Sequence, residues 1–392
     1  MNRFIYLDYQ ATTPVDPRVV TEMLPFLTEQ FGNPASNHAK GIEAELAITK
    51  ARQDIAAQLN VSPQEIYFTS GASEGNNLAI KGVLRAHKKG HIITVATEHK
   101  CVLNACNRLK QEGFSVTVLP VNVLGFIDIT TLENALQEDT IMISVMYGNN
   151  ETGVLQPIQE IGKLAQKKDI ILHCDATQSI GHLPLNPNEW GISLLTFSGH
   201  KIYGPKGIGG LYISRELTNN RRILCEIDGG GQEQGMRGGT LNVPGIIGLQ
   251  KALNLVGNGY NTEPQRLSSL RACFLKALDD GAVDYICNTP LEQSLPHCLN
   301  LSFPGINGQQ LLAQLSSLGL SATSACSSGS QQSSHVLHAM GVPPNLIDAS
   351  FRLSIGRYTS QEDVAQAIER LLNALSLQKN PLPLTTRRAP SF

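Results

Sequence analysis

The chain has 392 residues, of which 41% are hydrophobic and 16% are charged, a composition typical of globular proteins rather than disordered or fibrous ones. Its formal net charge of −2 does not favour a nucleic-acid or an anionic-membrane partner. Because single cores stop growing near about 250–300 residues, this length predicts one large domain and one smaller domain.

The eight cysteines are scattered along the chain, with no CxxC pair and no short regular spacing. This pattern argues against a disulfide framework and against a zinc site. The N-terminal MNRFIYLDYQ lacks a basic stretch followed by an apolar one, so no secretory signal is predicted. No apolar run reaches the roughly 18 residues that a membrane span requires. We therefore expect a cytoplasmic location, where cysteines stay reduced.

Short β-branched and apolar runs alternate with longer amphipathic stretches from about residue 40 to 255. This alternation predicts βα units around a mostly parallel sheet, and seven strands suggest one doubly wound domain. The predicted strands are 65–69, 91–96, 115–120, 140–146, 170–175, 194–198 and 209–213, and the predicted helices between them are 42–59, 73–89, 102–112, 131–137 and 158–168.

After residue 255 the pattern changes to a second, smaller α+β domain. A helix is expected near 266–278, short strands near 283–287 and 299–303, and a C-terminal helix at 361–377. The tail that follows is rich in proline and is predicted to be frayed.

Two polar segments follow predicted apolar strands at their carboxyl ends, where open α/β sheets bind ligands: HCDATQS at 173–179 and SGHKIYGPKG at 198–207. A carboxylate and a lysine in these places suit pyridoxal 5′-phosphate (PLP). Asp175 would keep the pyridine nitrogen protonated, and Lys201 would form the Schiff base. From these residues alone, a surface lysine in a Gly/Pro loop and a helix-capping aspartate remain open alternatives.

The segment FTSGASEGNN at 68–77 predicts a strand, then Gly71, then a helix that opens at Ser73. The free N–H groups and the dipole at such a helix start favour a phosphate, although a plain capped turn between strand and helix remains the alternative. No Walker motif is present, and the Gly-rich stretches 204–210 and 229–239 contain no GxGxxG between a strand and a helix. The sequence therefore does not predict a nucleotide or NAD site.

His335 and His338 form an HxxH pair with no third ligand nearby in the sequence. No metal site is predicted from them, because a protein zinc site needs at least three ligands. We expect both histidines to lie on a solvated helix face.

Long motifs in a fixed order carry a resemblance to a known family. The chain resembles the NifS/IscS-type cysteine desulfurases, which are fold-type-I PLP enzymes of the class-V aminotransferase family. The resemblance runs from about residue 5 to 375. The motifs are YLDYQATTPVDPRV, FGNPAS, FTSGASEGNNLAIKG, TEHK, NNETG, HCDATQS, SGHKIYGPKGIG, GGGQEQGMRGGT and FRLSIGR.

The resemblance implies an α/β fold of the fold-type-I PLP-dependent transferase class, with a mostly parallel seven-stranded sheet in a large domain. The large domain would span 12–255, and a smaller α+β domain would combine 1–11 with 256–392. A homodimer, L-cysteine as substrate and a sulfur-acceptor or iron–sulfur scaffold protein as partner are also implied. No membrane or nucleic acid is expected to bind.

The resemblance also assigns the site residues. Lys201 would carry PLP, Asp175 would pair with the pyridine nitrogen, and His99 would stack over the ring and move protons. The flat guanidinium of Arg352 suits a substrate carboxylate. The remaining implied residues are Asn150 and Gln178 for the ring oxygen, the Ala72 backbone, Ser73, Ser198 and His200 for the phosphate, Thr240 from the second subunit, and Asn33 beside Arg352.

Cys326 is the implied nucleophile, a single cysteine within the small polar stretch TSACSSGSQQSS at 323–334. Structural cysteines usually have apolar neighbours, which Cys326 lacks. Its thiolate would attack the substrate sulfur and hold it as a persulfide while alanine leaves. Because small polar residues dominate 324–334, we expect this loop to be mobile.

The sequence departs from many relatives in reading SATSAC where they have SSGSAC, and MYGNNETG where a histidine often precedes the paired asparagines. These departures leave the nucleophile intact. The C-terminal tail is short and differs in composition from that of relatives that dock an iron–sulfur scaffold, so the identity of the sulfur acceptor stays open. A cyst(e)ine or selenocysteine lyase of the same fold and a catalytically silent scaffold protein are the alternatives. A lyase has no use for Cys326, and intact Lys201 and Asp175 argue against a silent scaffold.

Overall fold

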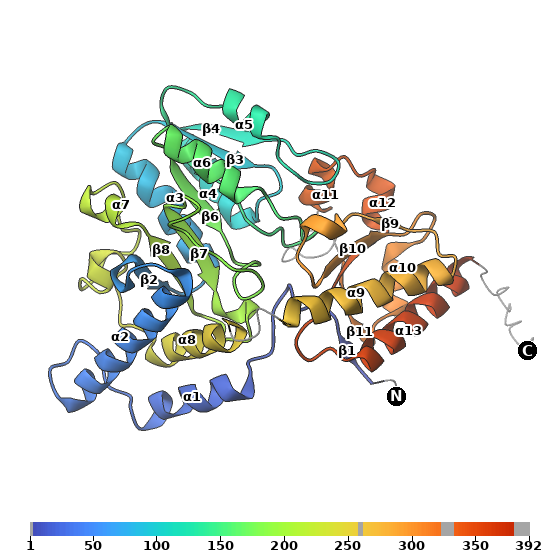
Figure 1. Ribbon diagram of the computed structural model, residues 1–392, viewed down its shortest axis with the longest axis horizontal. Helices are drawn as coiled ribbons and strands as arrows, with labels where there is room; N and C mark the ends of the chain where they lie inside the picture. The colour runs from blue at the N-terminus through green and yellow to red at the C-terminus, as the bar shows by residue number, and fades with distance from the viewer. Residues whose placement is uncertain (1–2, 258–261, 323–332, 380–392) are drawn as a thin grey trace, which may run out of the picture.

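The computed structural model describes residues 3–257, 262–322 and 333–379 of the chain. The helices and strands form two parts that lie side by side and have separate hydrophobic cores (Figure 1). The larger part surrounds a seven-stranded sheet, and the smaller part contains a four-stranded sheet.

The seven-stranded sheet has the order β2-β8-β7-β6-β5-β3-β4. Neighbours from β7 to β4 run parallel, whereas β8 pairs antiparallel with both β2 and β7. This agrees with the predicted, mostly parallel sheet, whose central strands are buried on both faces. The strands are β2 (Ile66–Thr69), β3 (His91–Val95), β4 (Ser115–Leu119), β5 (Thr140–Ser144), β6 (Ile171–Asp175), β7 (Leu194–Ser198) and β8 (Gly209–Ile213).

Helices cover both faces of this sheet, as a doubly wound fold requires (Figure 1). One face packs against α3, α4 and α7, and the opposite face packs against α2, α5, α6 and α8, with α1 lying against α8. The helices are α1 (Pro17–Thr28), α2 (Ala39–Leu59), α3 (Ala72–His87), α4 (Lys100–Gln111), α5 (Ile129–Asn134), α6 (Ile158–Lys167), α7 (Arg215–Asn219) and α8 (Val243–Gly257).

The smaller part joins the start of the chain to its end. Ile5 and Leu7 are buried in the core of this part, and the short strand β1 pairs in parallel with β11. The four-stranded sheet has the order β12-β13-β10-β9, and α9 packs against α13 beside it. The elements are β1 (Ile5–Tyr6), α9 (Glu263–Asp280), β9 (Ile286–Cys287), β10 (Cys298–Ser302), α10 (Gly308–Gln314), β11 (Leu318–Gly319), β12 (Ser321–Ala322), α11 (His335–Ala339), α12 (Pro344–Asp348), β13 (Ser350–Ser354) and α13 (Gln361–Lys379).

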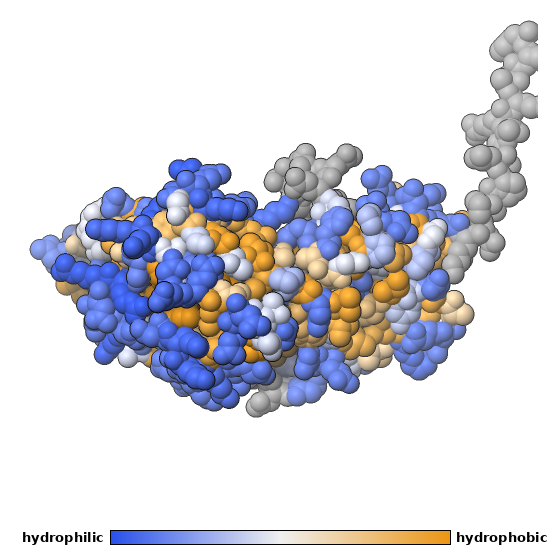
Figure 2. Space-filling model, turned by 90° about the horizontal axis from the view of Figure 1, so that it is seen from above, coloured by the Kyte–Doolittle hydropathy of each residue, from blue (hydrophilic) through white to orange (hydrophobic). Residues whose placement is uncertain are grey.

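One face of the molecule carries apolar side chains toward its middle over both parts, while hydrophilic residues line its margins (Figure 2). No helix in the ranges that the structure describes is both long and apolar enough to span a membrane.

The expected position of the HxxH pair is wrong for one of its two histidines. His338 is exposed, but His335 is half-buried and its Nε2 donates to the backbone oxygen of Glu98 at 2.8 Å. The cause is the short helix α11, which buries Val336 and Leu337 and so turns His335 inward. Within the described ranges, no group of three His, Cys, Asp or Glu side chains is arranged to hold a metal ion.

Two histidine rings stack between the two parts of the molecule. His182, which follows β6, lies with its ring centroid 4.0 Å from that of His297, which precedes β10. Burial lowers the pKa of His182 from 6.5 to about 4. Burial, with the nearby His182 and Arg271, lowers the pKa of His297 as well. Both rings are therefore neutral near pH 7, and a charge on either would be costly.

We expect this pair to make the protein sensitive to acid. As the pH falls below about 6.5, the unfolded chain binds a proton at His182 before the folded chain does. The free energy of unfolding should then fall by about 1.4 kcal/mol per pH unit for such a histidine, until its folded pKa is reached. His182→Phe keeps a stacked ring that cannot titrate, so its urea unfolding between pH 7 and pH 5 should depend less steeply on pH. Equal slopes in the two proteins would contradict this expectation.

Candidate active site

The site lies at the carboxyl ends of two neighbouring parallel strands, β6 and β7. Asp175 is the last residue of β6, Ser198 is the last residue of β7, and Lys201 ends the short 3-10 helix that follows. Because the strands are parallel, their carboxyl ends meet at one edge of the sheet. A cavity of about 730 Å³ opens there.

The structure brings most of the predicted site residues to this one cavity. Residues far apart in the sequence, from α3, α4, β6, β7 and β13, contribute to its wall. The predicted residues that line it are Ala72, Ser73, His99, Asn150, Asp175, Gln178, Ser198, His200, Lys201 and Arg352.

The amine of Lys201 is held by the N-terminal segment. Its Nζ donates to the backbone oxygens of Gln10 at 2.5 Å and Ala11 at 2.8 Å. Burial, together with the nearby charge of Arg352, lowers the pKa of Lys201 to about 8. With this pKa about a tenth of the amine is uncharged at pH 7 and about half at pH 8, and the uncharged amine is the form that a nucleophilic lysine needs.

The carboxylate of Asp175 is fixed by two donors. Its Oδ2 accepts from Asn76 Nδ2 at 2.7 Å, and its Oδ1 accepts from the backbone N–H of Thr177 at 2.9 Å. The residue is only 5% exposed. An oriented carboxylate in this place can hold a proton on a pyridine nitrogen.

The start of α3 offers a place for a phosphate. The helix begins at Ala72 after Gly71, whose φ of 151° no other residue adopts readily and which supplies no side chain to cap the helix. The first N–H groups of the helix therefore face the cavity together with the hydroxyl of Ser198 and the ring of His200. The ring of His200 is held by Thr12, whose Oγ1 lies 3.1 Å from its Nδ1.

Arg352 lies on β13 and reaches the cavity from the smaller part. Its Nη2 pairs with Asp8 Oδ1 at 2.7 Å and also donates to Ser321 Oγ at 3.2 Å, while Nη1 donates to the backbone oxygen of Asn150. Its buried Nε has no hydrogen-bond partner in the part of the chain that the structure describes. This guanidinium is oriented before any ligand arrives and lines the cavity, where a planar cation suits a carboxylate.

Replacing Arg352 with alanine should weaken the use of an amino-acid substrate far more than the binding of PLP. Loss of a charged hydrogen-bond partner costs about 2–4 kcal/mol, which corresponds to a fall in kcat/KM of about 30- to 1000-fold. Arg352→Lys keeps the charge but not the two-pronged geometry and should fall in between. The bound-PLP absorbance and the Tm should be compared in parallel, because Asp8 also loses its partner. Wild-type kcat/KM in Arg352→Ala would exclude the carboxylate role.

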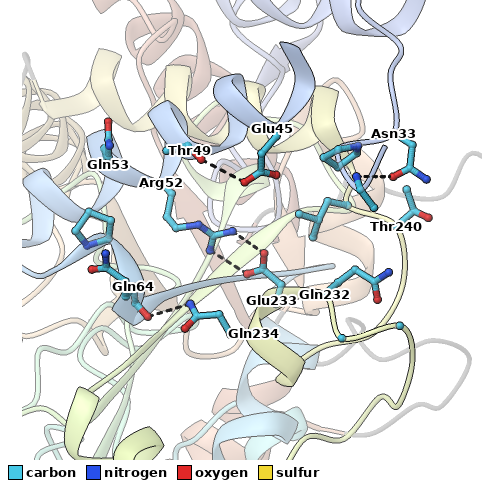
Figure 3. A pocket seen from close by; sticks show the side chains of 16 residues that line it. Asn33, Glu45, Thr49, Arg52, Gln53, Gln64, Gln232, Glu233, Gln234 and Thr240 are labelled. Carbon is cyan, nitrogen blue, oxygen red and sulfur yellow. Dashed lines mark hydrogen bonds and ion pairs between the residues drawn. The ribbon is translucent and has the colours of Figure 1, made fainter. Parts of the chain in front are cut away.

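Two predicted residues lie elsewhere in the chain. Asn33 and Thr240 line a separate cavity of about 500 Å³, which also contains the ion pair of Arg52 with Glu233 (Figure 3). Asn33 is exposed, and its Oδ1 accepts from the backbone N–H of Ala35. Asn33 is thus not beside Arg352 within one chain, because the turn between α1 and α2 holds it in the second cavity.

Cys326 lies outside the described residues. Several residues of the site carried no prediction, among them Asp8, Gln10, Asn76 and Cys101. Asp8, Gln10 and Asn76 fall within the quoted motifs and Cys101 directly follows TEHK, but nothing in a single sequence says which of these side chains contact one another or the catalytic residues.

Comparisons with known proteins identify the family. The family described as aminotransferase class-V matches residues 5–367. The cysteine desulfurase IscS of Rickettsia bellii is 45% identical over 97% of this chain and 93% of its own length. The human cysteine desulfurase is 44% identical over 97% of this chain and 84% of its own length. The chain belongs to the cysteine desulfurases of the class-V aminotransferase family.

Solved structures agree with this family. A NifS-like protein superposes with a TM-score of 0.89 at 37% identity, covering 95% of this chain and 100% of the other. SspA in complex with cysteine superposes with a TM-score of 0.81 at 38% identity, covering 91% and 100%. The fold is that of fold-type-I PLP enzymes, as predicted.

This desulfurase-family chain is a PLP-dependent enzyme, and its cavity fits that cofactor. A lysine with a lowered pKa, an oriented carboxylate and an uncapped helix start face one space. The buried Oδ1 of Asn150, which has no partner in the described ranges, supplies a further polar atom for a bound group.

Proposed function

We propose that the chain is an L-cysteine desulfurase, which converts L-cysteine to L-alanine and holds the sulfur as a persulfide on Cys326. The observation that carries the proposal is the meeting of Lys201, Asp175 and Arg352 at one cavity. The first two suit PLP, and the third suits the carboxylate of an amino acid. The relatives named above bear the same activity in their names.

The chain's own residues divide the work. PLP, when bound, supplies an electron sink for the substrate. Asp175 holds the proton on the ring nitrogen, and Ser73, Ser198 and His200 with the start of α3 hold the phosphate. Lys201 provides the attachment point and a base. His99, which lines the cavity, would cover the face of the bound ring and move protons.

Arg352 would hold the carboxylate of the substrate cysteine. The thiolate of Cys326 forms the S–S bond as the C–S bond of cysteine breaks, and the carbon chain gains the protons that complete alanine. One L-cysteine and one enzyme thiol thus give one L-alanine and one enzyme persulfide, with no outside oxidant. The position of Asp175, Lys201 and Arg352 at one cavity supports this division of roles.

The test is mass spectrometry of the purified, PLP-loaded protein after incubation with L-cysteine, combined with an alanine assay. We expect alanine to form together with added sulfur on a peptide containing Cys326. Alanine with released elemental sulfur, or pyruvate with ammonia and sulfide, and in either case no adduct, would instead point to a lyase of the same fold. A protein that binds PLP and forms neither alanine nor pyruvate would contradict both activities.

We also propose that the enzyme is a homodimer that shares its active sites. The cavity that contains Asn33 and Thr240 is separate from that of Lys201, so these residues need a second copy to act on PLP. A group of exposed apolar side chains on α1, α2 and the turn between them supports contact with a second copy of the chain, because such groups often mark protein interfaces. These residues are Val20, Leu24, Leu27, Phe31, Ile42 and Leu46.

Complementation between two variants tests the shared site. If Thr240 acts across the dimer, a hybrid of a Lys201→Ala subunit with a Thr240→Val subunit contains one intact site. Random re-association of equal amounts should then restore roughly a quarter of the wild-type activity at limiting PLP. Each variant alone should stay far below that level. A mixture no more active than its parents after verified subunit exchange, or a fully active monomer, would contradict the proposal.

We further propose that the sulfur passes to an acceptor or iron–sulfur scaffold protein in the cytoplasm. The name IscS of the Rickettsia bellii relative supports the transfer of sulfur. The scattered cysteines, which show no disulfide spacing, support a reducing compartment.

A further inference from the structure

The ring of His99 accepts a hydrogen bond from the backbone at the beginning of α4. His99 is the N-cap residue of this helix, and the backbone N–H of Cys101 donates to its Nδ1 at 3.2 Å. An N–H group can only donate, so Nδ1 must carry a lone pair. The proton of the neutral ring therefore sits on Nε2, the nitrogen that remains for a group in the cavity.

The thiol of Cys101 adds a second contact to the same nitrogen. Its Sγ lies 3.0 Å from His99 Nδ1 and accepts from Asn76 Nδ2 at 3.2 Å. Burial and the nearby charge of Asp175 raise the pKa of this thiol to about 12. The thiol therefore keeps its hydrogen. The hydroxyl of Ser73 is also a hydrogen-bond partner of this thiol and lowers its pKa as a donor to the sulfur, so the lone pair on His99 Nδ1 remains as the acceptor for the S–H.

Asn76 connects these groups to Asp175. Its side chain is fully buried on α3, and the two hydrogens of its amide reach Asp175 Oδ2 at 2.7 Å and Cys101 Sγ at 3.2 Å. Each hydrogen bond in this network joins one donor to one acceptor. Asn76 donates to Asp175 and to Cys101, and Cys101 donates to His99.

We propose that Asn76 and Cys101 are positioning residues, which together orient the carboxylate of Asp175 and hold His99 in the tautomer with its proton on Nε2. The proposal rests on the proposed function for its catalytic meaning. His99 then presents a proton donor to the cavity first, and a proton taken up at Nδ1 would break both bonds at the start of α4. This agrees with the lowered pKa of His99, for which burial is the largest cause.

Charged groups from every side also act on His99. Asp175 raises its pKa, whereas Lys201, His335 and Lys100 lower it. All of these groups remain in a variant that changes only the thiol. A difference between Cys101 variants therefore reports the thiol contact itself.

The test uses protein labelled with ¹⁵N-histidine, with and without PLP, and His99→Gln to assign the His99 signals. Long-range ¹⁵N–¹H correlations should show a proton on Nε2 in the wild type. In Cys101→Ala the His99 titration should move toward higher pH by roughly half a pH unit, because one weak donor to the neutral ring is lost. Cys101→Ser restores a donor and should return the titration toward that of the wild type.

The matched control is Cys106→Ala, which removes a buried thiol from the same helix without touching His99. It should leave the His99 titration unchanged. A wild-type ring protonated at Nδ1, or equal titrations in Cys101→Ala and the wild type, would overturn the proposal for Cys101.

Asn76→Ala tests the hydrogen bond at the Asp175 end of this network. We expect PLP to bind about tenfold more weakly, because the carboxylate of Asp175 loses a donor. Unchanged PLP affinity would overturn the role of Asn76.

An activity arm separates this proposal from the proposed function. The acid limb of the pH profile for alanine formation should move with the His99 titration in Cys101→Ala. If the wild type forms no alanine, the proposed function fails while the tautomer measurement still stands. If alanine forms, and Cys101→Ala changes neither the acid limb of the pH profile nor the His99 titration, only the positioning role of Cys101 is wrong.

Discussion

Lys201→Ala is expected to abolish the visible absorbance of covalently bound PLP and to lower alanine formation by about 1000-fold or more. Two functions are lost together, since the amine is both the attachment point and a base in the cavity. Absorbance spectra of the purified variant and a direct alanine assay check the expectation. Residual binding of PLP through the phosphate site should remain, because α3, Ser198 and His200 are untouched.

Lys206→Ala is the matched control, since Lys206 lines the same cavity but is exposed on the loop after Lys201. This variant should keep the absorbance. The pKa of about 8 for Lys201 adds a second measurement on the wild type. The rate at which the PLP-free protein takes up PLP should rise with pH and level off above about pH 8, as the amine loses its proton. Bound-PLP absorbance and turnover in Lys201→Ala would show that another amine carries the cofactor.

The sequence predicted the seven-stranded sheet well because its strands are short apolar runs bounded by turns. All seven predicted strands are present, with ends within two residues of the observed ones. The helix α8 was not predicted, since it is apolar on nearly every side and shows no helical alternation. The helix α1 was not predicted either, and its Pro25 and exposed apolar residues blur its pattern. Both helices depend on packing partners that a single sequence does not reveal.

The site was predictable where a motif follows a strand and unpredictable where contacts cross the two parts. Asp175 and Lys201 are read from strand ends, and the structure places both at one cavity. The pairing of Asp8 with Arg352 joins residues 344 positions apart, so no local pattern reports it. The same holds for Asn76, whose partners lie on β6 and α4. The division of the chain at 12–255 remains a proposal, for which the two separate cores are the support.

Cys326→Ser is expected to keep PLP binding and lose sulfur transfer. A serine hydroxyl cannot form a persulfide, so alanine formation should fall by about 100-fold or more and the sulfur adduct should vanish. The other cysteines near the site are poor substitutes. Burial raises the pKa of Cys101 to about 12 and that of Cys298 to about 12, so their thiolates are scarce near neutral pH. Mass spectrometry and an alanine assay under matched conditions measure both losses.

The matched control is Cys273→Ser, because Cys273 is an exposed thiol on α9, far in sequence from the cavity residues. It should retain the adduct and the wild-type rate of alanine formation, which would show that exposure alone does not make a thiol the sulfur carrier. Spectra recorded after adding L-cysteine should change in both variants, since Lys201, Asp175 and Arg352 are intact. If Cys326→Ser forms alanine near the wild-type rate, sulfur leaves without Cys326, and the enzyme acts as a lyase rather than through an enzyme persulfide.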